Sequence, residues 1–257
     1  MLNTSGCAAS TSVPLSSRES PPPRRPPAGR SGVGCETERE QTSPRRPTAF
    51  EQPISGTQTG VMRTVYSPES APPRGFYTLL TASVAPRPIA WISSLSADGI
   101  RNLAPYSFFT VASGEPPILS VTSLGHKDSW RNIRDTGEFV VNIGTESLME
   151  VMNETSAPLP ADVDEFKVAG VRGEASDVVA APRVAEAPIA LECRRHDIVE
   201  VGNGTLLLGE VVSVAVDDDV LAEDGLPDFR KLLPPSRLGR LEWGFAPRTQ
   251  WIARPKG

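Results

Sequence analysis

Cysteine is scarce in this sequence, which has only three in 257 residues. Cys7, Cys35 and Cys193 lie far apart, so their spacing indicates neither a disulfide framework nor a metal site. Cys193 stands in an apolar stretch, and we expect it to be a small buried residue in a reducing compartment. The N-terminus also lacks the apolar core of a secretory signal, which favours a cytoplasmic location. Its bias toward serine and arginine leaves an organelle transit peptide as the alternative.

Long apolar runs and an excess of positive charge are absent as well. The sequence contains no apolar run of about 18 residues, so it predicts no membrane-spanning helix. The formal net charge is -5, which argues against nucleic acid as the main partner, because proteins that bind nucleic acid usually present a basic face.

The sequence signatures of several enzyme classes are missing. No Gly-x-Gly-x-x-Gly follows a predicted strand, which argues against a Rossmann dinucleotide-binding unit. There is no nucleophile elbow, paired-carboxylate signature or Cys/His arrangement that would indicate hydrolysis. His126 and His196 have no partners at metal-ligand spacing. The residues therefore single out no catalytic group.

The first 72 residues have few aromatic side chains and no apolar periodicity. Proline, serine, threonine, glycine and arginine dominate them, and such a segment cannot bury enough surface to offset its ordering entropy. We therefore expect residues 1–72 to be a disordered tail, and residues 73–257 to form one domain. An alternative is that Met62 is the true start of the protein.

A predicted hairpin over residues 87–109 is the most unusual stretch. Residues 88–95 are rich in β-formers, Asp98-Gly99 favours a tight turn, and a second strand over 100–104 is expected to end at Pro105. Alternation places Arg87, Trp91 and Ser93 on one face among apolar groups, and neither face is polar throughout. The first strand should therefore be covered on both sides. A bound polar ligand with a flat apolar body would satisfy this mixture of side chains.

The rest of the chain predicts many short strands and few short helices. We expect strands at 76–82, 108–112, 118–123 and 138–143, and a long hairpin of 189–201 with 205–216. Helices are expected from Asp128 or Ser129, as N-cap, to Gly137, and over 146–154. Residues 155–188 form a long excursion that is either a lid or a simple insertion. This pattern indicates a mainly β protein, either a barrel or a sandwich.

Lys127 is the most informative single charge, because it stands at the start of a predicted helix. A phosphate docked there would accept hydrogen bonds from free amides, the Ser129 hydroxyl and the Lys127 ammonium. The alternative is an exposed lysine in a capped turn. Residues 102–107 likewise either present hydrogen bonds to a heterocycle or form a self-satisfied Asx-type turn. Trp91 could pack beside a ring system, although core tryptophans are commoner.

Several motifs, in order and at these spacings, resemble the flavin reductase-like family. They are Arg87-Pro-Ile-Ala-Trp-Ile-Ser-Ser, Asn102-Leu-Ala-Pro-Tyr-Ser-Phe-Phe, Lys127-Asp-Ser-Trp-Arg-Asn-Ile, Glu138-Phe-Val-Val-Asn-Ile, Glu165-Phe, Ala169-Gly, Pro182-Arg-Val, Leu191-Glu-Cys, Leu208-Gly-Glu-Val-Val and Arg237-Leu-Gly. The similarity runs from about residue 76 to 243. It implies an FMN-binding split β-barrel with short peripheral helices, usually a homodimer. Members include flavoredoxin-like proteins and reductase components that supply reduced flavin to a monooxygenase.

The resemblance also implies roles for individual residues. It suggests that Lys127, Asp128 and Ser129 hold the FMN phosphate region, with Arg240 as a further contact. Around the isoalloxazine and ribityl chain it places Arg87, Trp91, Ser93, Asn102, Ala104, Tyr106 and Ser107. One departure is that many relatives resemble Gly-Asp-His-Thr-Leu where this chain reads Gly202-Asn203-Gly204-Thr205-Leu206. The missing imidazole puts a His-assisted nicotinamide step in doubt.

These observations lead to a functional hypothesis. We expect an FMN-binding oxidoreductase in which NAD(P)H gives a hydride to flavin N5, with a monooxygenase or another protein as the electron acceptor. One alternative is an electron-carrier flavoprotein that does not oxidise NAD(P)H. The other is a β-barrel that holds no flavin and serves as an interaction module.

Overall fold

The computed structural model describes residues 62–70 and 75–255. The expected disorder of residues 1–72 therefore falls largely outside the described residues, as do Cys7 and Cys35. The described part before the domain is a short stretch that ends in the 3-10 turn η1, Pro68–Ser70.

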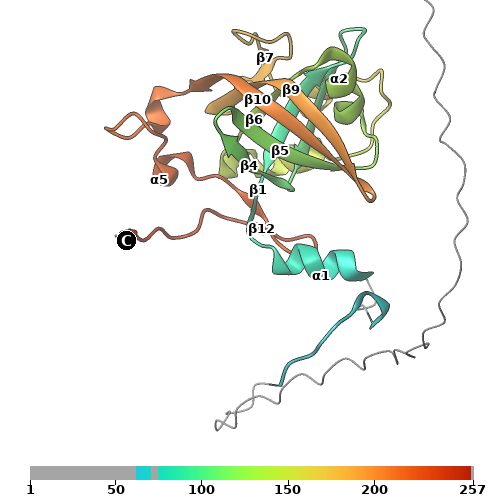
Figure 1. Cartoon of the computed structure of the whole chain (residues 1–257). Coiled ribbons are helices and arrows are strands. Elements are labelled where there is room, and N and C mark those ends of the chain that lie inside the picture. Colours follow the sequence, from blue (N-terminus) through green and yellow to red (C-terminus); the bar gives the residue numbers. More distant parts are fainter. Residues whose placement is uncertain (1–61, 71–74, 256–257) are drawn as a thin grey trace, which may run out of the picture. The chain divides into compact units, whose positions relative to one another are not determined.

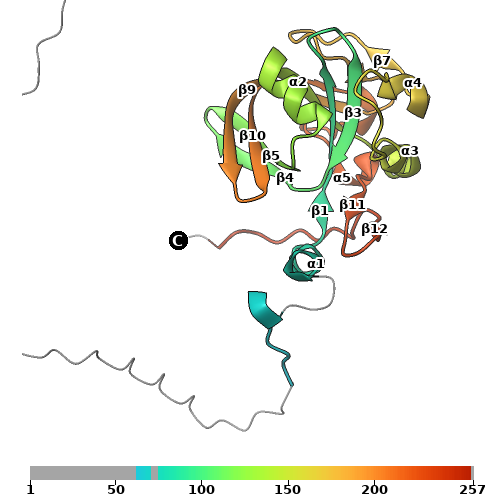
Figure 2. The same cartoon turned by 90° about the vertical axis from the view of Figure 1, so that its right-hand side faces the viewer.

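The centre of the domain is a seven-stranded antiparallel sheet with the spatial order β3-β2-β6-β9-β10-β5-β4. Figures 1 and 2 show this sheet curled into a barrel. In chain order its strands are β2 Ala90–Leu95, β3 Arg101–Tyr106, β4 Phe109–Gly114, β5 Pro117–Leu124, β6 Glu138–Ile143, β9 Ile189–Val201 and β10 Gly204–Val216. The predicted barrel strands and the long hairpin are thus confirmed.

Two small sheets and a few short helices surround the barrel. One small sheet joins β1 Arg87–Pro88, β11 Ser236–Arg237 and β12 Trp243–Gly244, and the other pairs β7 Gly173–Glu174 with β8 Arg183–Val184. The helices are α1 Gly75–Ser83, α2 Asp128–Thr136, α3 Met149–Glu154, α4 Glu165–Ala169 and α5 Phe229–Leu232, with 3-10 turns η2 Glu146–Leu148 and η3 Asp218–Val220. None of the described helices is long and apolar enough to cross a membrane.

Both faces of β2 are covered, as its sequence predicts. On one face Ala90 and Ile92 join the barrel core, in which Trp130 and Ile133 of α2 are also buried. On the other face Trp91 packs with side chains from the segment between β6 and β9, which carries α3 and α4. The strand therefore lies between two apolar layers.

Two predicted elements are wrong. Residues 76–82 form helix α1 rather than a strand, because Phe76, Leu79 and Leu80 follow the helical spacing i, i+3, i+4 and the loose alternation was misleading. The second hairpin strand does not end before Pro105. Pro105 pairs with Trp91 inside β3, which is tolerated because β3 lies at the edge of the sheet and no neighbour needs the missing donor.

Helix α2 joins the core to the surface at the end of β3. It packs against β2, β3, β6 and β9, and Figure 2 shows it beside β3. It ends at Gly137, as predicted, and this glycine has a left-handed conformation with φ 75°. Its first turn faces the region where β3 ends. This arrangement brings residues 102–106 and 126–131 together.

Candidate functional site

A cavity of about 290 Å³ lies between the end of β3 and the start of α2. Its walls come from β3, from the turn that leads into α2, and from residues 155–159 after α3, with Glu165 at one side. Six residues that the sequence predicts for the site line this one cavity: Asn102, Ala104, Tyr106, Lys127, Asp128 and Ser129.

The start of α2 has no capping side chain. The N-cap residue is Lys127, not Asp128 or Ser129 as predicted, and no side chain at this helix start accepts a capping hydrogen bond. Because the first-turn amides of a helix have no partner within the helix, they are left for another acceptor. Lysine at this position is unfavourable for an isolated helix, since the positive end of the dipole repels it. An anion at this place would satisfy both the amides and the ammonium.

The Lys127 ammonium has no acidic partner in the described part of the chain. Its Nζ lies 5.6 Å from the centroid of the Tyr106 ring, a cation–π distance. The neighbouring Asp128 carboxylate instead accepts a hydrogen bond from Arg131. The positive charge of Lys127 is thus available to a ligand in the cavity.

A chain of buried hydrogen bonds fixes the wall of the cavity. The Ser129 hydroxyl donates to Asn102 Oδ1 at 2.6 Å, and Asn102 Nδ2 donates to Glu165 Oε2 at 2.6 Å. The amide of Leu103 donates to the same carboxylate oxygen. Ser129 therefore uses its only proton inside the protein, so its side chain positions the start of α2, and its backbone amide is the free donor.

Glu165 is a functional candidate that sequence reasoning missed. Its side chain is buried, and this burial raises the pKa of its carboxyl to about 7, with Asp128 and Asp164 nearby adding to the effect. The residue forms part of one of the motifs noted in the sequence, but nothing there indicates its partners. Asn102 is 63 positions away, and only the folded chain brings the two together.

Tyr106 closes the inner side of the cavity. Its ring is buried, and burial raises the pKa of its phenol above the usual value, although the Ser123 and Ser129 hydroxyls nearby oppose the rise. Among the described residues its hydroxyl has no partner at good hydrogen-bond geometry. A buried hydroxyl without a partner is uncommon and is often found at functional sites.

Three other predicted residues line a neighbouring cavity of about 230 Å³: Arg87, Ser107 and Arg240. A shallower depression joins the two cavities, since it shares Tyr106 and Lys127 with the first and Tyr77 and Ser107 with the second. These nine predicted residues thus lie along one continuous surface.

Trp91 and Ser93 line neither cavity. Trp91 Nε1 donates to Thr155 Oγ1 at 2.9 Å, and the Ser93 hydroxyl donates to the Pro182 carbonyl at 2.5 Å. Asn142 Nδ2 adds a hydrogen bond to Ser93 at 3.0 Å. The polar groups on this face of β2 are therefore satisfied by the protein itself, without a ligand.

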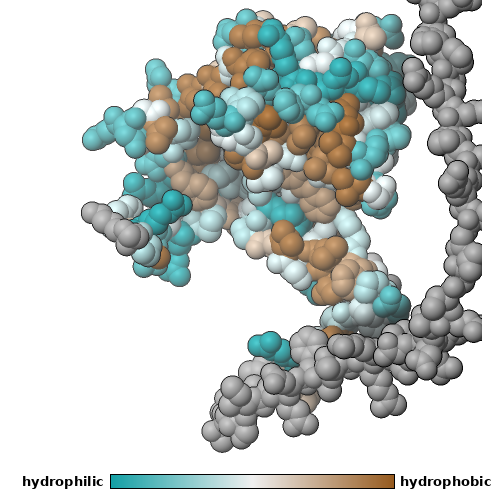
Figure 3. Space-filling model, in the orientation of Figure 1, coloured by the Kyte–Doolittle hydropathy of each residue, from teal (hydrophilic) through white to brown (hydrophobic). Residues whose placement is uncertain are grey.

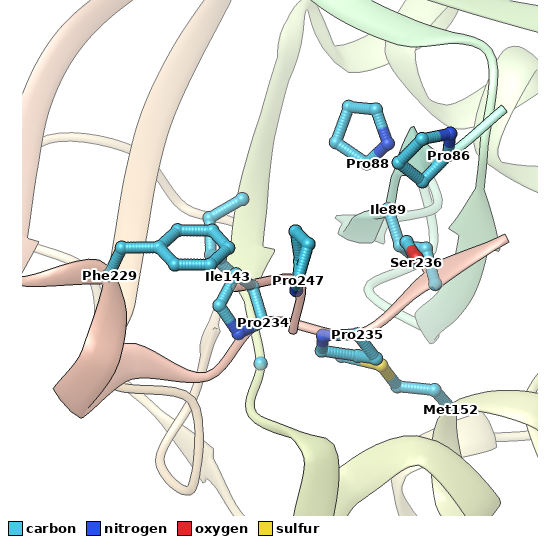
Figure 4. Close-up of a pocket in the computed structure, with 11 residues that line it drawn as sticks. Pro86, Pro88, Ile89, Ile143, Met152, Phe229, Pro234, Pro235, Ser236 and Pro247 are labelled. Carbon is cyan, nitrogen blue, oxygen red and sulfur yellow. The ribbon is translucent and has the colours of Figure 1, made fainter. Parts of the chain in front are cut away.

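A third cavity, shown in Figure 4, is apolar and lies apart from these residues. It has a volume of about 210 Å³ and is lined by Pro86, Pro88, Ile89, Ile143, Gly144, Met152, Phe229, Pro234, Pro235, Ser236 and Pro247. None of these side chains is charged, so this cavity offers nothing to a phosphate.

No metal site is present in the part of the chain that the structure describes. No three His, Cys, Asp or Glu side chains there are grouped so as to hold an ion. His126 instead stacks on Trp130, with ring centroids 3.9 Å apart, and its Nε2 lies 3.6 Å from a Glu200 oxygen.

The turn between β9 and β10, where the sequence departs from the pattern Gly-Asp-His-Thr-Leu, lies close to the candidate site. The amide of Gly125 donates to the Asn203 carbonyl at 3.4 Å, two residues before Lys127. Gly204 pairs with Leu124 of β5. The position where many relatives resemble a histidine, and this chain does not, is therefore next to the cavity and not in a distant loop.

Residues 82–233, more than half of the chain, match the family model described as flavin reductase like domain. The chain belongs to this family. An uncharacterized protein of Aquifex aeolicus is 40% identical over 168 residues, which are 63% of this chain and 86% of that protein. An uncharacterized protein of Halalkalibacterium halodurans is 36% identical over 201 residues, which are 74% of this chain and 95% of that protein.

Solved structures of family-like proteins share the fold. Nitrilotriacetate monooxygenase component B from Bacillus cereus is 32% identical, with a TM-score of 0.71 over 76% of this chain and 100% of that chain. The 2-nitrobenzoate 2-nitroreductase of Pseudomonas fluorescens is 28% identical, with a TM-score of 0.69 over 75% of this chain and 96% of that chain. A putative flavin reductase with a split barrel domain from Shewanella frigidimarina is 21% identical, with a TM-score of 0.68 over 73% of this chain and 96% of that chain.

These findings confirm the resemblance and the mainly β split-barrel fold. They assign the chain to a family of flavin-related oxidoreductases. The first cavity combines free amides and an ammonium, which suit a phosphate group, with the buried ring of Tyr106.

Proposed function

We propose that this protein binds FMN in the cavity between β3 and α2 and reduces it with a hydride from NAD(P)H. The observation that carries the proposal is the helix start at Lys127, which has no capping side chain and borders a cavity large enough for part of a ligand. Its place in a chain of the flavin reductase like domain family makes a flavin phosphate the fitting anion.

The first-turn amides of Asp128 and Ser129, with the Lys127 ammonium, would hold the phosphate. Asn102, Ala104 and Tyr106 line the same cavity and would contact the ribityl chain and the ring. Ser107, Arg87 and Arg240 lie further along the surface. Trp91 and Ser93 would not touch the flavin. Their hydrogen bonds would support the site indirectly, because they hold β2 in place.

Bound FMN would supply the redox chemistry by accepting a hydride at N5. The residues of the chain then have to bind and orient the reactants and exclude water, and none of them needs to act as a nucleophile. The buried hydrogen bonds of Ser129, Asn102 and Glu165 hold the cavity wall in one geometry. Binding of FMN would therefore cost little conformational entropy in these side chains.

A charge reversal at Lys127 tests the phosphate site. FMN added to Lys127→Glu should bind at least about tenfold more weakly than to the wild type, since a charge-assisted contact is replaced by repulsion. The matched control is Lys231→Glu on α5, which changes the net charge equally and lies outside the cavity. Quenching of FMN fluorescence measures the affinity, and equal affinities for the two variants would remove Lys127 from the site.

Anaerobic spectra test the reaction. NADH or NADPH should bleach the absorbance of the protein-bound oxidised flavin. Binding without bleaching would favour an electron-carrier flavoprotein with another donor. A folded protein that binds no FMN would favour a β-barrel that serves as an interaction module.

We also propose that the protein forms a homodimer in the cytoplasm and passes electrons to a monooxygenase or another acceptor protein. Exposed apolar side chains on α1 and directly after it support self-association (Figure 3), since Leu80 of the helix is 52% exposed and Val84, which follows the helix, is 63% exposed. The likeness to nitrilotriacetate monooxygenase component B supports a monooxygenase partner. Light scattering at several concentrations tests the dimer, and a monomeric mass at all of them would contradict it.

A further inference from the structure

The second cavity, lined by Arg87, Arg237 and Arg240, is rich in unpaired positive charge. We call it the arginine cavity; its other lining residues are Tyr77, Thr78, Thr81, Ser107 and Leu241. None of the lining residues is acidic, and none of the three arginines forms an ion pair within residues 62–70 and 75–255.

Arg87 is fixed in this position. The residue is 7% exposed, and its guanidinium donates to the carbonyls of Thr81, Val84 and Leu238, with distances of 2.7 Å to Val84 and 2.8 Å to Leu238. Carbonyl oxygens satisfy its hydrogen bonds but do not neutralise its charge. A buried charge without a counter-charge is costly, so an anion that approaches this cavity is strongly favoured.

Arg237 and Arg240 add to the positive charge of the arginine cavity. Burial and the charge of Arg87 lower the pKa of the Arg237 guanidinium, which shows that the two positive charges lie close enough to repel each other. The Arg240 side chain makes no hydrogen bond within the described residues and is free to reach a ligand. Arg240 also has a left-handed backbone with φ 56°, a conformation that costs energy for a residue with a side chain and is often kept at binding sites.

An aromatic wall connects the arginine cavity with the proposed FMN cavity. Tyr77 and Phe108 line the depression between them, and their rings lie 6.2 Å apart at 60°. Lys127, at the other end of this depression, belongs to the proposed FMN phosphate site. One surface therefore carries two basic sites separated by aromatic side chains, whereas FMN has a single phosphate.

We infer that the arginine cavity binds a phosphate group of the nicotinamide dinucleotide donor, at a site separate from that of the FMN phosphate. The inference rests on the proposed function, in which such a dinucleotide is the electron donor. The phosphate is either the 2′-phosphate that only NADPH has or the pyrophosphate that NADH and NADPH share. In both cases the guanidinium groups recognise a phosphate oxygen.

Calorimetric titration of the FMN-saturated protein tests the inference. The probes are adenosine 2′,5′-bisphosphate, which presents the 2′-phosphate, and ADP, which presents the pyrophosphate. The test variant is Arg240→Gly, because glycine adopts the φ of 56° without strain and the fold is retained. The control is Arg248→Gly, which removes an exposed arginine outside the cavity.

The wild type should bind at least one probe, and Arg240→Gly should weaken that binding by about tenfold while FMN affinity stays the same. Arg248→Gly should bind like the wild type. Tighter binding of the bisphosphate assigns the cavity to the 2′-phosphate, and tighter binding of ADP assigns it to the pyrophosphate.

Three results would overturn the inference. The first is a wild type that binds neither probe. The second is an Arg240→Gly variant that loses FMN affinity instead, which would make the cavity part of the FMN phosphate site. The third is a variant whose only change is in self-association, which would indicate that a carboxylate of a second copy fills the cavity. These experiments measure binding, so their outcome does not depend on flavin bleaching. If NADH and NADPH fail to bleach the flavin, it is the proposed role of the dinucleotide as electron donor that fails.

Discussion

Glu165 gives the sharpest test of the site, because a buried carboxyl makes the stability of the fold depend on pH. Its pKa is raised from 4.5 to about 7, chiefly by burial. The folded chain therefore holds a proton on Glu165 more readily than the unfolded chain does between pH 4.5 and about 7. It follows that stability decreases as the pH rises through this window and is not regained above it.

The size of the effect follows from the shift. At about 1.4 kcal/mol per pH unit, keeping the carboxylate charged in the folded chain costs about 3 kcal/mol at pH 8. Glu165→Gln removes this cost. It also keeps both hydrogen bonds, because Asn102 Nδ2 and the Leu103 amide donate to the same oxygen, which a glutamine side chain can supply.

Urea unfolding at pH 5 and pH 8, followed by tryptophan fluorescence, measures the difference. Glu165→Gln should be close to the wild type at pH 5 and more stable by up to about 3 kcal/mol at pH 8. Glu165→Ala leaves two buried donors without an acceptor, so it should be less stable than Glu165→Gln by about 1–3 kcal/mol at both pH values. If wild type and Glu165→Gln change in parallel between pH 5 and pH 8, the reasoning about Glu165 is refuted.

Three further predictions concern the barrel itself. Gly209→Ala would place a Cβ 2.3 Å from Cζ of the buried Phe139, so its free energy of unfolding should fall by about 1–3 kcal/mol in urea; unchanged stability would show that the ring can move aside. Thr155→Val removes the acceptor of Trp91 Nε1 and should cost about 1–3 kcal/mol with a shift of the tryptophan emission, and an emission spectrum like that of the wild type would argue against this buried contact. Burial raises the pKa of the Cys193 thiol to about 12, so peptide mass spectrometry should find it unmodified by iodoacetamide at pH 8 until urea unfolds the chain; rapid modification of the folded protein would contradict this.

Much of the fold could be predicted because local patterns and tertiary structure agree. The strand at 138–143 has the bounds of β6, and Gly202-Asn203-Gly204 marks the turn between two long strands, β9 and β10. Helix α2 ends at its predicted glycine. The prediction of a strand at α1 was wrong because the local pattern there is ambiguous. This helix exposes much of its surface, and its short apolar pattern fits both the helical and the strand period.

The candidate site could be predicted in part. Lys127 and Asn102 could be predicted for the site because residue chemistry at a helix start and at a strand end is visible in the sequence, and both residues line the same cavity. Trp91 was harder to place, because the same side chain suits a ligand pocket or a core, and here its partner is Thr155, 64 positions away. The role of Glu165 could not be predicted, because its raised pKa and its hydrogen bonds exist only once α4 lies on β3.

The hydrogen bonds that join Ser129, Asn102 and Glu165 also determine when the wall of the cavity can form during synthesis. Asn102 is 27 positions from Ser129 and 63 from Glu165, so no growing chain that ends before α4 can complete this part of the wall. Synthesis must pass residue 165 before the binding surface exists. The wall of the proposed flavin cavity is therefore completed late in synthesis, by a residue that lies almost two thirds of the way along the chain.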